Sequence, residues 1–177
     1  SIINGYTPGP ATEKEWAETY PLEKEALDYF INNAGSPNGV IDGGIPVFAA
    51  GNEYAGNPAF PGAYSKCVCV SSLAADFTPA CYTDFGSLVT LSAPGGDLEY
   101  YSKIGEQEDE YWAETTEQKG AVLSTMIKNG QPAYGYMEGT SMACPHVSGV
   151  AALGLAYAAK TNRHYRAADF VALMKKS

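Results

Sequence analysis

Residues 141–159, which contain the longest apolar stretch of the chain, are apolar on nearly every side when they are drawn as a helix. Such a helix has no polar face to turn toward water, so it must lie inside a folded domain and be covered by other elements. Its apolar part, residues 147–159, is too short and too rich in alanine and glycine to read as a membrane span. We therefore expect a central buried helix.

Other apolar runs, separated by turn-rich segments, predict the remaining elements. Residues 45–50 form a continuous apolar run, which is typical of a strand buried on both faces of a parallel sheet. Further strands are expected at residues 67–71, 88–92 and 122–125, with a hairpin-like stretch at 134–136. A capping box at Thr12 opens a helix that Pro21 interrupts, and a covering helix closes the chain at residues 167–174. The alternation predicts a single α/β domain with a mostly parallel central sheet.

Composition excludes some classes of function. Of the 177 residues, 45% are hydrophobic and 18% charged, as in folded proteins, and the net charge of −9 argues against nucleic-acid binding. Acidic residues gather at residues 97–120, which we interpret as a surface insertion. The alternatives are an acidic binding surface and a calcium site, although the acids do not have the spacing of an EF-hand loop. Cys67 and Cys69 are expected to be thiols in the core. The four cysteines could form disulfides in three different pairings, and the sequence does not choose among them. No cofactor is expected.

The segment GTSMACPHVSG, residues 139–149, carries the strongest chemical signal. Gly139 allows a close backbone approach, and Ser141 follows where the apolar helix begins. The first N–H groups of a helix are unpaired and carry partial positive charge, so they suit an anionic intermediate. Ser141 is therefore either a nucleophile at an anion-binding helix terminus or, with Thr140, an N-cap residue, and spacing alone does not decide.

The same segment resembles the nucleophile motif of the subtilisin-like serine proteases, G-T-S-M-A-x-P-H-V, and matches it without a break. By this resemblance Ser141 is the catalytic nucleophile, which attacks the scissile carbonyl and forms an acyl-enzyme. Residues 44–53 resemble the family strand that ends in A-A-G-N. Asn52 then corresponds to the asparagine that donates to the oxyanion together with the backbone N–H of Ser141, rather than being a turn residue after Gly51.

Weaker matches follow in the order of the family. Phe60-Pro61 resembles an aromatic–proline pair that is often cis, so we expect a cis peptide bond. Residues 80–86 resemble A-S-Y-S-N-x-G, and residues 93–96 with 123–125 resemble A-P-G…S-T, separated by the acidic insertion. The resemblance covers nearly the whole chain and implies a three-layer subtilisin-like fold.

The resemblance also implies residues that bind substrate. The opening segment is similar to the family's I-N-x-S-x-G strand, which lines the S1 pocket. Asn4 matches, but residues 5–9, Gly-Tyr-Thr-Pro-Gly, replace the usual Ser-x-Gly, and Pro8 cannot donate a backbone hydrogen bond. The implied substrate-binding residues are Asn4, Tyr6, Ala49, Ala50 and Gly51. Thr90 stands near a position where relatives place a cation-binding aspartate, so a metal site is not supported there.

The other two catalytic motifs of the family, Asp-Ser/Thr-Gly and His-Gly-Thr, do not occur in the sequence. Its two histidines are His146, inside the serine motif, and His164, and neither precedes a glycine. Asp42-Gly43-Gly44 lies directly before the oxyanion strand and is expected to be a loop. We therefore expect residues 1–177 to be the C-terminal part of a subtilisin-like peptidase domain, without its N-terminal strands and inactive alone.

The expected function is that of a serine endopeptidase, secreted or bound to the cell envelope, which acts on peptide or protein substrates. An unpaired first strand would self-associate or require the N-terminal half of the domain from another chain. The alternative function is a non-catalytic peptide-binding or scaffold module on the same fold. An esterase of the α/β-hydrolase kind is disfavoured because its G-x-S-x-G elbow is absent.

Overall fold

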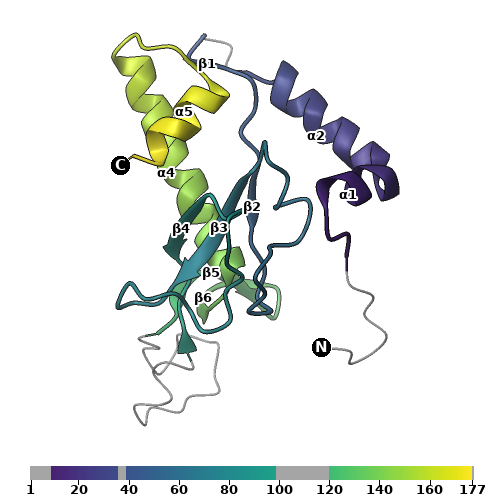
Figure 1. Cartoon of the computed structure of the whole chain (residues 1–177). Coiled ribbons are helices and arrows are strands. Elements are labelled where there is room, and N and C mark those ends of the chain that lie inside the picture. The colour runs from purple at the N-terminus through teal and green to yellow at the C-terminus, as the bar shows by residue number, and fades with distance from the viewer. Residues whose placement is uncertain (1–8, 36–38, 99–119, 177) are drawn as a thin grey trace.

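The computed structural model describes residues 9–35, 39–98 and 120–176. At its centre is a three-stranded sheet with the order β2 (Val47–Ala49), β3 (Val68–Leu73) and β4 (Leu91–Pro94), all parallel (Figure 1). These strands confirm the α/β fold with a mostly parallel sheet. The predicted opening strand, and nearly all of the acidic insertion at 97–120, lie outside the described residues.

The central strand, β3, is buried along its length except at Leu73, which is half-buried. By contrast, the three residues of β2 are all half-buried. The prediction that residues 45–50 form a strand buried on both faces is therefore wrong. The reason is position: β2 pairs only with β3 and forms an edge of the described sheet.

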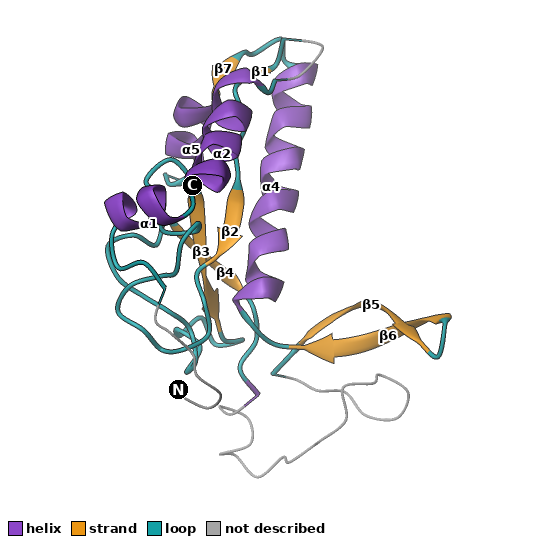
Figure 2. Cartoon of the chain, turned by 90° about the vertical axis from the view of Figure 1, so that its right-hand side faces the viewer, coloured by secondary structure: helices purple, strands orange, loops and turns teal. Residues whose placement is uncertain are grey.

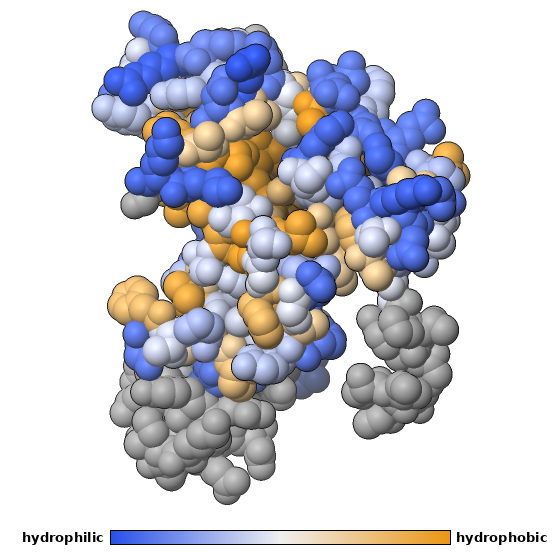
Figure 3. Space-filling view, in the orientation of Figure 1, coloured by the Kyte–Doolittle hydropathy of each residue, from blue (hydrophilic) through white to orange (hydrophobic). Residues whose placement is uncertain are grey.

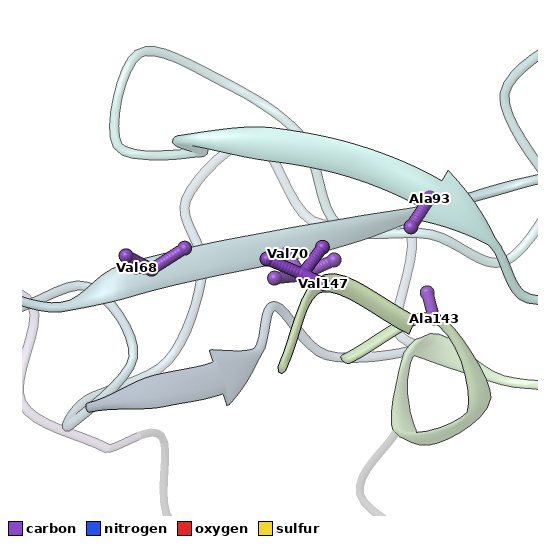
Figure 4. Close-up of a cluster of buried hydrophobic side chains, with 5 residues drawn as sticks. All are labelled: Val68, Val70, Ala93, Ala143 and Val147. Atoms are coloured by element: carbon purple, nitrogen blue, oxygen red, sulfur yellow. The ribbon is translucent and has the colours of Figure 1, made fainter. Parts of the chain in front are cut away.

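The long helix α4 (Thr140–Lys160) lies on one face of this sheet and contacts all three strands (Figure 2). Its Ala143 and Val147 join Val68, Val70 and Ala93 in a buried cluster between helix and sheet (Figure 4). Small side chains let the helix approach the sheet closely, which holds its first turn beside the ends of the strands.

The opposite face of α4 corrects the prediction of a helix buried all round. Val150, Leu153 and Tyr157 lie on one side of the helix and are 61%, 73% and 63% exposed. None of the described elements covers this side. By length and composition alone α4 could cross a membrane. Its contacts with the sheet are those of a core helix in a folded domain.

The first two helices begin where the sequence predicts. α1 (Glu13–Thr19) has Thr12 as its N-cap, with the Thr12 hydroxyl accepting from the Glu15 N–H at 3.2 Å. α2 (Pro21–Asn33) starts at its proline, because a missing N–H costs nothing in the first turn.

The Phe60-Pro61 peptide bond is cis, as the resemblance predicts. The Phe60 ring stacks on Trp16 of α1 with ring centroids 5.4 Å apart, and Tyr64 packs on the same indole at 5.2 Å. Trp16 is only 1% exposed. This aromatic cluster attaches α1 and α2 to the segment between β2 and β3.

At the far end of α4, β1 (Ile41–Asp42) pairs in parallel with β7 (Tyr165–Arg166), and α5 (Ala167–Met174) follows. Phe170 of α5 packs there in a buried cluster with Ile41 and Ala151. The prediction that Asp42-Gly43-Gly44 is a loop is therefore wrong at its first residue. Asp42 is drawn into a strand by pairing with a segment that lies far away in the sequence.

The predicted hairpin is confirmed as β5 (Val122–Lys128) and β6 (Gln131–Met137), which are antiparallel. Asn129 and Gly130 between them both have positive φ, 51° and 76°, as a two-residue hairpin turn requires. Figure 2 shows the hairpin extending away from the sheet and helices.

A cavity of about 470 Å³ lies between α2, the beginnings of β2 and β3, and α5. Apolar side chains gather in this hollow (Figure 3). Cys67 lies on its wall and Cys69 is fully buried nearby in β3. Burial raises the pKa of Cys67 to about 12 and that of Cys69 to about 11. Cys67 and Cys69 form no disulfide within the described residues, so these two are core thiols as expected.

Candidate active site

Ser141 lies exposed in the first turn of α4. This turn is held in place where the backbone around Gly139 contacts the backbone around Gly95. The Gly139 N–H donates to the Gly95 carbonyl at 2.9 Å. A side chain on residue 95 would begin 2.1 Å from the Ser72 hydroxyl and 2.6 Å from the Gly139 carbonyl. The A-P-G-G segment at the end of β4 can therefore pack on the start of α4 only because residue 95 is glycine.

Asn52 follows β2 and is joined to the residue before Ser141. Its side-chain oxygen accepts from the Thr140 N–H and from the Thr140 hydroxyl, both at 2.9 Å. A backbone N–H can only donate, so the amide oxygen must face Thr140 and the NH₂ group must face away. The sequence offered Thr140 only as an N-cap, and its place directly before Ser141 was the one signal of this role.

Two hydrogen-bond donors border one small space beside Ser141. A Cβ on Gly139 would lie 3.6 Å from Asn52 Nδ2 and 3.7 Å from the Ser141 backbone nitrogen. Neither donor has a hydrogen-bond partner within the described ranges. The start of the α4 helix adds partial positive charge. The space that Gly139 leaves open can therefore accept a negatively charged oxygen.

The structure places both histidines away from the Ser141 hydroxyl. His146 Nδ1 lies 2.8 Å from the Met142 carbonyl oxygen, on its own helix. His164 pairs with Asp42 beyond the other end of α4, which is about 30 Å long for its 21 residues. Over the parts of the chain that the structure describes, no imidazole hydrogen bonds to Ser141.

The other expected site residues fall into two groups. Ala49 and Gly51 are half-buried beside Asn52, whereas Ala50 is 0% exposed and its N–H donates to the Val70 carbonyl at 2.9 Å. Asn4 and Tyr6 lie outside the described residues. The structure thus places four of the expected residues at the end of the sheet where β2 stops: Ser141, Asn52, Ala49 and Gly51.

No group of three or more His, Cys, Asp or Glu residues is gathered as a metal site would require, within residues 9–35, 39–98 and 120–176. The Thr90 hydroxyl accepts from the Cys69 N–H at 3.1 Å, so this side chain serves the link between β3 and the segment before β4.

Comparison with known proteins gives one consistent result. The sequence profile of the subtilase family matches residues 7–176. Halolysin of Haloferax mediterranei is 38% identical over 112 residues, which is 63% of this chain and 17% of that protein. A halolysin-like extracellular serine protease of Natrialba magadii is 32% identical over 113 residues, 64% of this chain and 16% of the relative.

Among solved structures, a protease of Pseudoalteromonas arctica superimposes with a TM-score of 0.57 and 31% identity, covering 75% of this chain and 35% of the other. The chain therefore spans well under half the length of each of these relatives.

Proposed function

Because this chain belongs to the subtilase family of serine proteases, we propose that it serves the hydrolysis of peptide bonds, with Ser141 as the nucleophile and Asn52 in the oxyanion hole. The observation that carries the proposal is the convergence of Asn52 Nδ2 and the Ser141 N–H on the space beside Gly139. Donors aimed at a developing oxyanion supply a large part of catalysis in acyl transfer.

The reaction follows from this geometry. The Ser141 hydroxyl oxygen bonds to the carbonyl carbon of the substrate while its proton passes to a base. The carbonyl oxygen becomes negative and is stabilised by the two converging donors. The C–N bond then breaks, the amine leaves with the proton from the base, and water cleaves the acyl-Ser141 ester by the same steps in reverse roles.

The base and its aspartate are, in this proposal, supplied from outside these 177 residues by the N-terminal half of the same domain. An associated copy of this chain could cover its open surfaces, but it lacks the same two motifs. Three observations support this. The described chain offers Ser141 no imidazole. The side of α4 formed by Val150, Leu153 and Tyr157 is apolar and exposed, and β2 has no second partner strand within the described residues. Another polypeptide can cover both surfaces. The chain also spans less than half of its relatives. Alone it is therefore inactive.

Intact-mass analysis after exposure to a fluorophosphonate tests the function. The chain alone is expected to remain unlabelled, and addition of a subtilase segment with the Asp and His motifs is expected to give one label. That label should be lost in Ser141→Ala. Labelling of the chain alone would overturn the claim of inactivity. A complex that forms yet stays unlabelled would contradict the protease proposal and favour the peptide-binding or scaffold alternative.

The location is also proposed. The Natrialba magadii relative is named as an extracellular protease, and we extend this location to the present protein. Immunodetection in separated culture medium and cell fractions tests it. Recovery only from the cytoplasmic fraction would contradict it.

A further inference from the structure

The loop that carries Asn52 is bound along its length to a second loop, residues 82–85. Asp84 N–H donates to the Gly51 carbonyl at 3.0 Å, and Tyr54 N–H donates to the Tyr82 carbonyl at 2.8 Å. Phe85 N–H adds a bond of 2.9 Å to the carbonyl of Ala55. Asn52 lies between the first two of these attachments, so its backbone position depends on the second loop.

Asp84 makes the closest contacts with this loop. One carboxylate oxygen, Oδ1, accepts from the N–H of Glu53 at 3.0 Å and from that of Ala55 at 2.8 Å. The other oxygen faces Gly51, where a Cβ would begin only 2.1 Å away. The carboxylate therefore touches the residues on both sides of Asn52.

The environment of Asp84 shows that this contact is not incidental to a surface. The residue is 3% exposed, and burial raises its pKa. A buried carboxylate is unfavourable unless it is hydrogen-bonded. Both hydrogen bonds that its side chain accepts from the described chain go to the loop that follows Asn52. Glu53 nearby carries the same charge and opposes ionisation further.

We infer that Asp84 is a positioning residue for the oxyanion donor. It fixes the backbone of residues 51–55, while Thr140 fixes the side-chain amide of Asn52 itself. With both anchors in place, Asn52 Nδ2 reaches the space beside Gly139 without reorganisation when charge develops there. This inference rests on the proposed role of Asn52 and adds a residue that contacts neither substrate nor Ser141.

Nuclear magnetic resonance on the full 177-residue chain tests it without requiring hydrolysis. In Asp84→Ala, amide hydrogen exchange at Glu53 and Ala55 is expected to rise by about tenfold or more, because each loses its acceptor. The side-chain NH₂ signals of Asn52 should shift as well. The Val68 N–H, which donates to the Pro46 carbonyl at 2.9 Å in the core, should keep its exchange rate.

Two further variants sharpen the result. Asp84→Asn keeps the accepting oxygen and is expected to restore wild-type exchange and the Asn52 signals. Asp76→Ala is the matched control: Asp76 also accepts a backbone N–H, from Thr78 at 3.0 Å, but on an exposed turn. It should leave the Asn52 loop unchanged.

Unchanged exchange at Glu53 and Ala55 in Asp84→Ala would overturn the inference, and so would an equal rise at Val68, which indicates a general loss of stability. If Asp84→Ala does not fold, the wild-type chain decides. Scalar couplings across the hydrogen bonds from Asp84 Cγ to the Glu53 and Ala55 nitrogens are expected, and their absence overturns the inference. None of these measurements depends on acylation of Ser141. A failure of the protease proposal would therefore be seen separately, in the fluorophosphonate experiment.

Discussion

The imidazole of His164 lies 2.8 Å from the carboxylate of Asp42, Nε2 to Oδ2, at the end of α4 opposite Ser141. Its other ring nitrogen, Nδ1, contacts the Gly39 carbonyl oxygen. An Asp–His pair is part of a serine protease triad, but this one joins β1 to the segment that enters β7. From this position we expect it to hold the two short strands in register.

The first prediction concerns pH and this pair. The Gly39 carbonyl, and then Asp42, raise the pKa of His164 above its ordinary 6.5. The stabilisation is therefore complete below about pH 6.5 and is lost as the pH rises through the higher folded-state pKa. Exchange of the Tyr165 N–H, which donates to the Val40 carbonyl at 3.0 Å, should be better protected at pH 6 than at pH 8 after correction for intrinsic rates.

The control for this prediction is His164→Gln, which should abolish the difference between the two pH values. His146→Gln, at the other histidine, should preserve it. An unchanged difference in His164→Gln would show that another group controls the pairing of β1 with β7.

A second prediction concerns Asp28 of α2. Its carboxylate accepts from Lys24 at 2.5 Å, from Lys66 at 2.8 Å and from the Tyr64 hydroxyl at 2.6 Å. These donors, Lys24 first, hold the pKa of Asp28 well below its usual range. Its stabilisation is present above about pH 4 and is lost as the pH falls. Asp28→Asn should cost about 1–2 kcal/mol at pH 7 and less at pH 3, measured by urea unfolding.

Glu18→Gln is the matched control for Asp28→Asn. The Lys14–Glu18 pair has a separation of 3.9 Å, and its side chains are 84% and 67% exposed. Its loss should change the free energy of unfolding by about 0.5 kcal/mol or less. Equal effects of the two substitutions would contradict the importance of the Asp28 cluster.

A third prediction concerns Gly139→Ala. The new methyl group would lie between the two oxyanion donors, 3.6 Å and 3.7 Å away, and the φ of 141° is unfavourable for alanine. Fluorophosphonate labelling of the complemented protein should slow by about a hundredfold or more. Gly149→Ala, where a Cβ meets nothing within 4 Å, should label normally and gain about 0.5–1 kcal/mol of helix stability. Labelling of Gly139→Ala at the wild-type rate would place the oxyanion elsewhere.

A fourth prediction separates the hydroxyl of Thr140 from its methyl group. The residue is 1% exposed, and its hydroxyl donates to Asn52 Oδ1 and accepts from the Gly51 N–H at 3.3 Å. Thr140→Val should cost about 1–3 kcal/mol, because it leaves buried polar groups unpaired. Thr140→Ser keeps the hydroxyl and should cost about 1 kcal/mol or less. Equal free energies of unfolding for the two variants would show that the Thr140 hydroxyl does not contribute to stability.

Local sequence patterns predicted the elements well where neighbouring residues decide the structure. Thr12 and Pro21 mark the starts of α1 and α2 through their own backbone chemistry. The burial of α4 was not predictable in the same way. An apolar side such as that of Leu153 shows which surface would gain from being covered, but not whether a covering layer is present.

The site shows the same division. The sequence predicted that a helix begins at Ser141. Only the family resemblance indicated that Ser141 is a nucleophile and not an N-cap residue. Asn52 and Thr140 are 88 residues apart, and Asp42 and His164 are 122 apart. Contacts over such separations arise from packing of the whole domain, so no local pattern encodes them. For the same reason Asp84 gave no sign of its contact with the Asn52 loop.

The parallel register of the central sheet determines how the chain can assemble. β2, β3 and β4 each pair with a strand that is separated by a long connection, and α4 reaches them from much later in the sequence. The hairpin of β5 and β6, and the helices α1 and α2, need only short loops to close. We therefore expect these local units to form early, and the sheet, which waits for the closure of long loops, to set the folding rate.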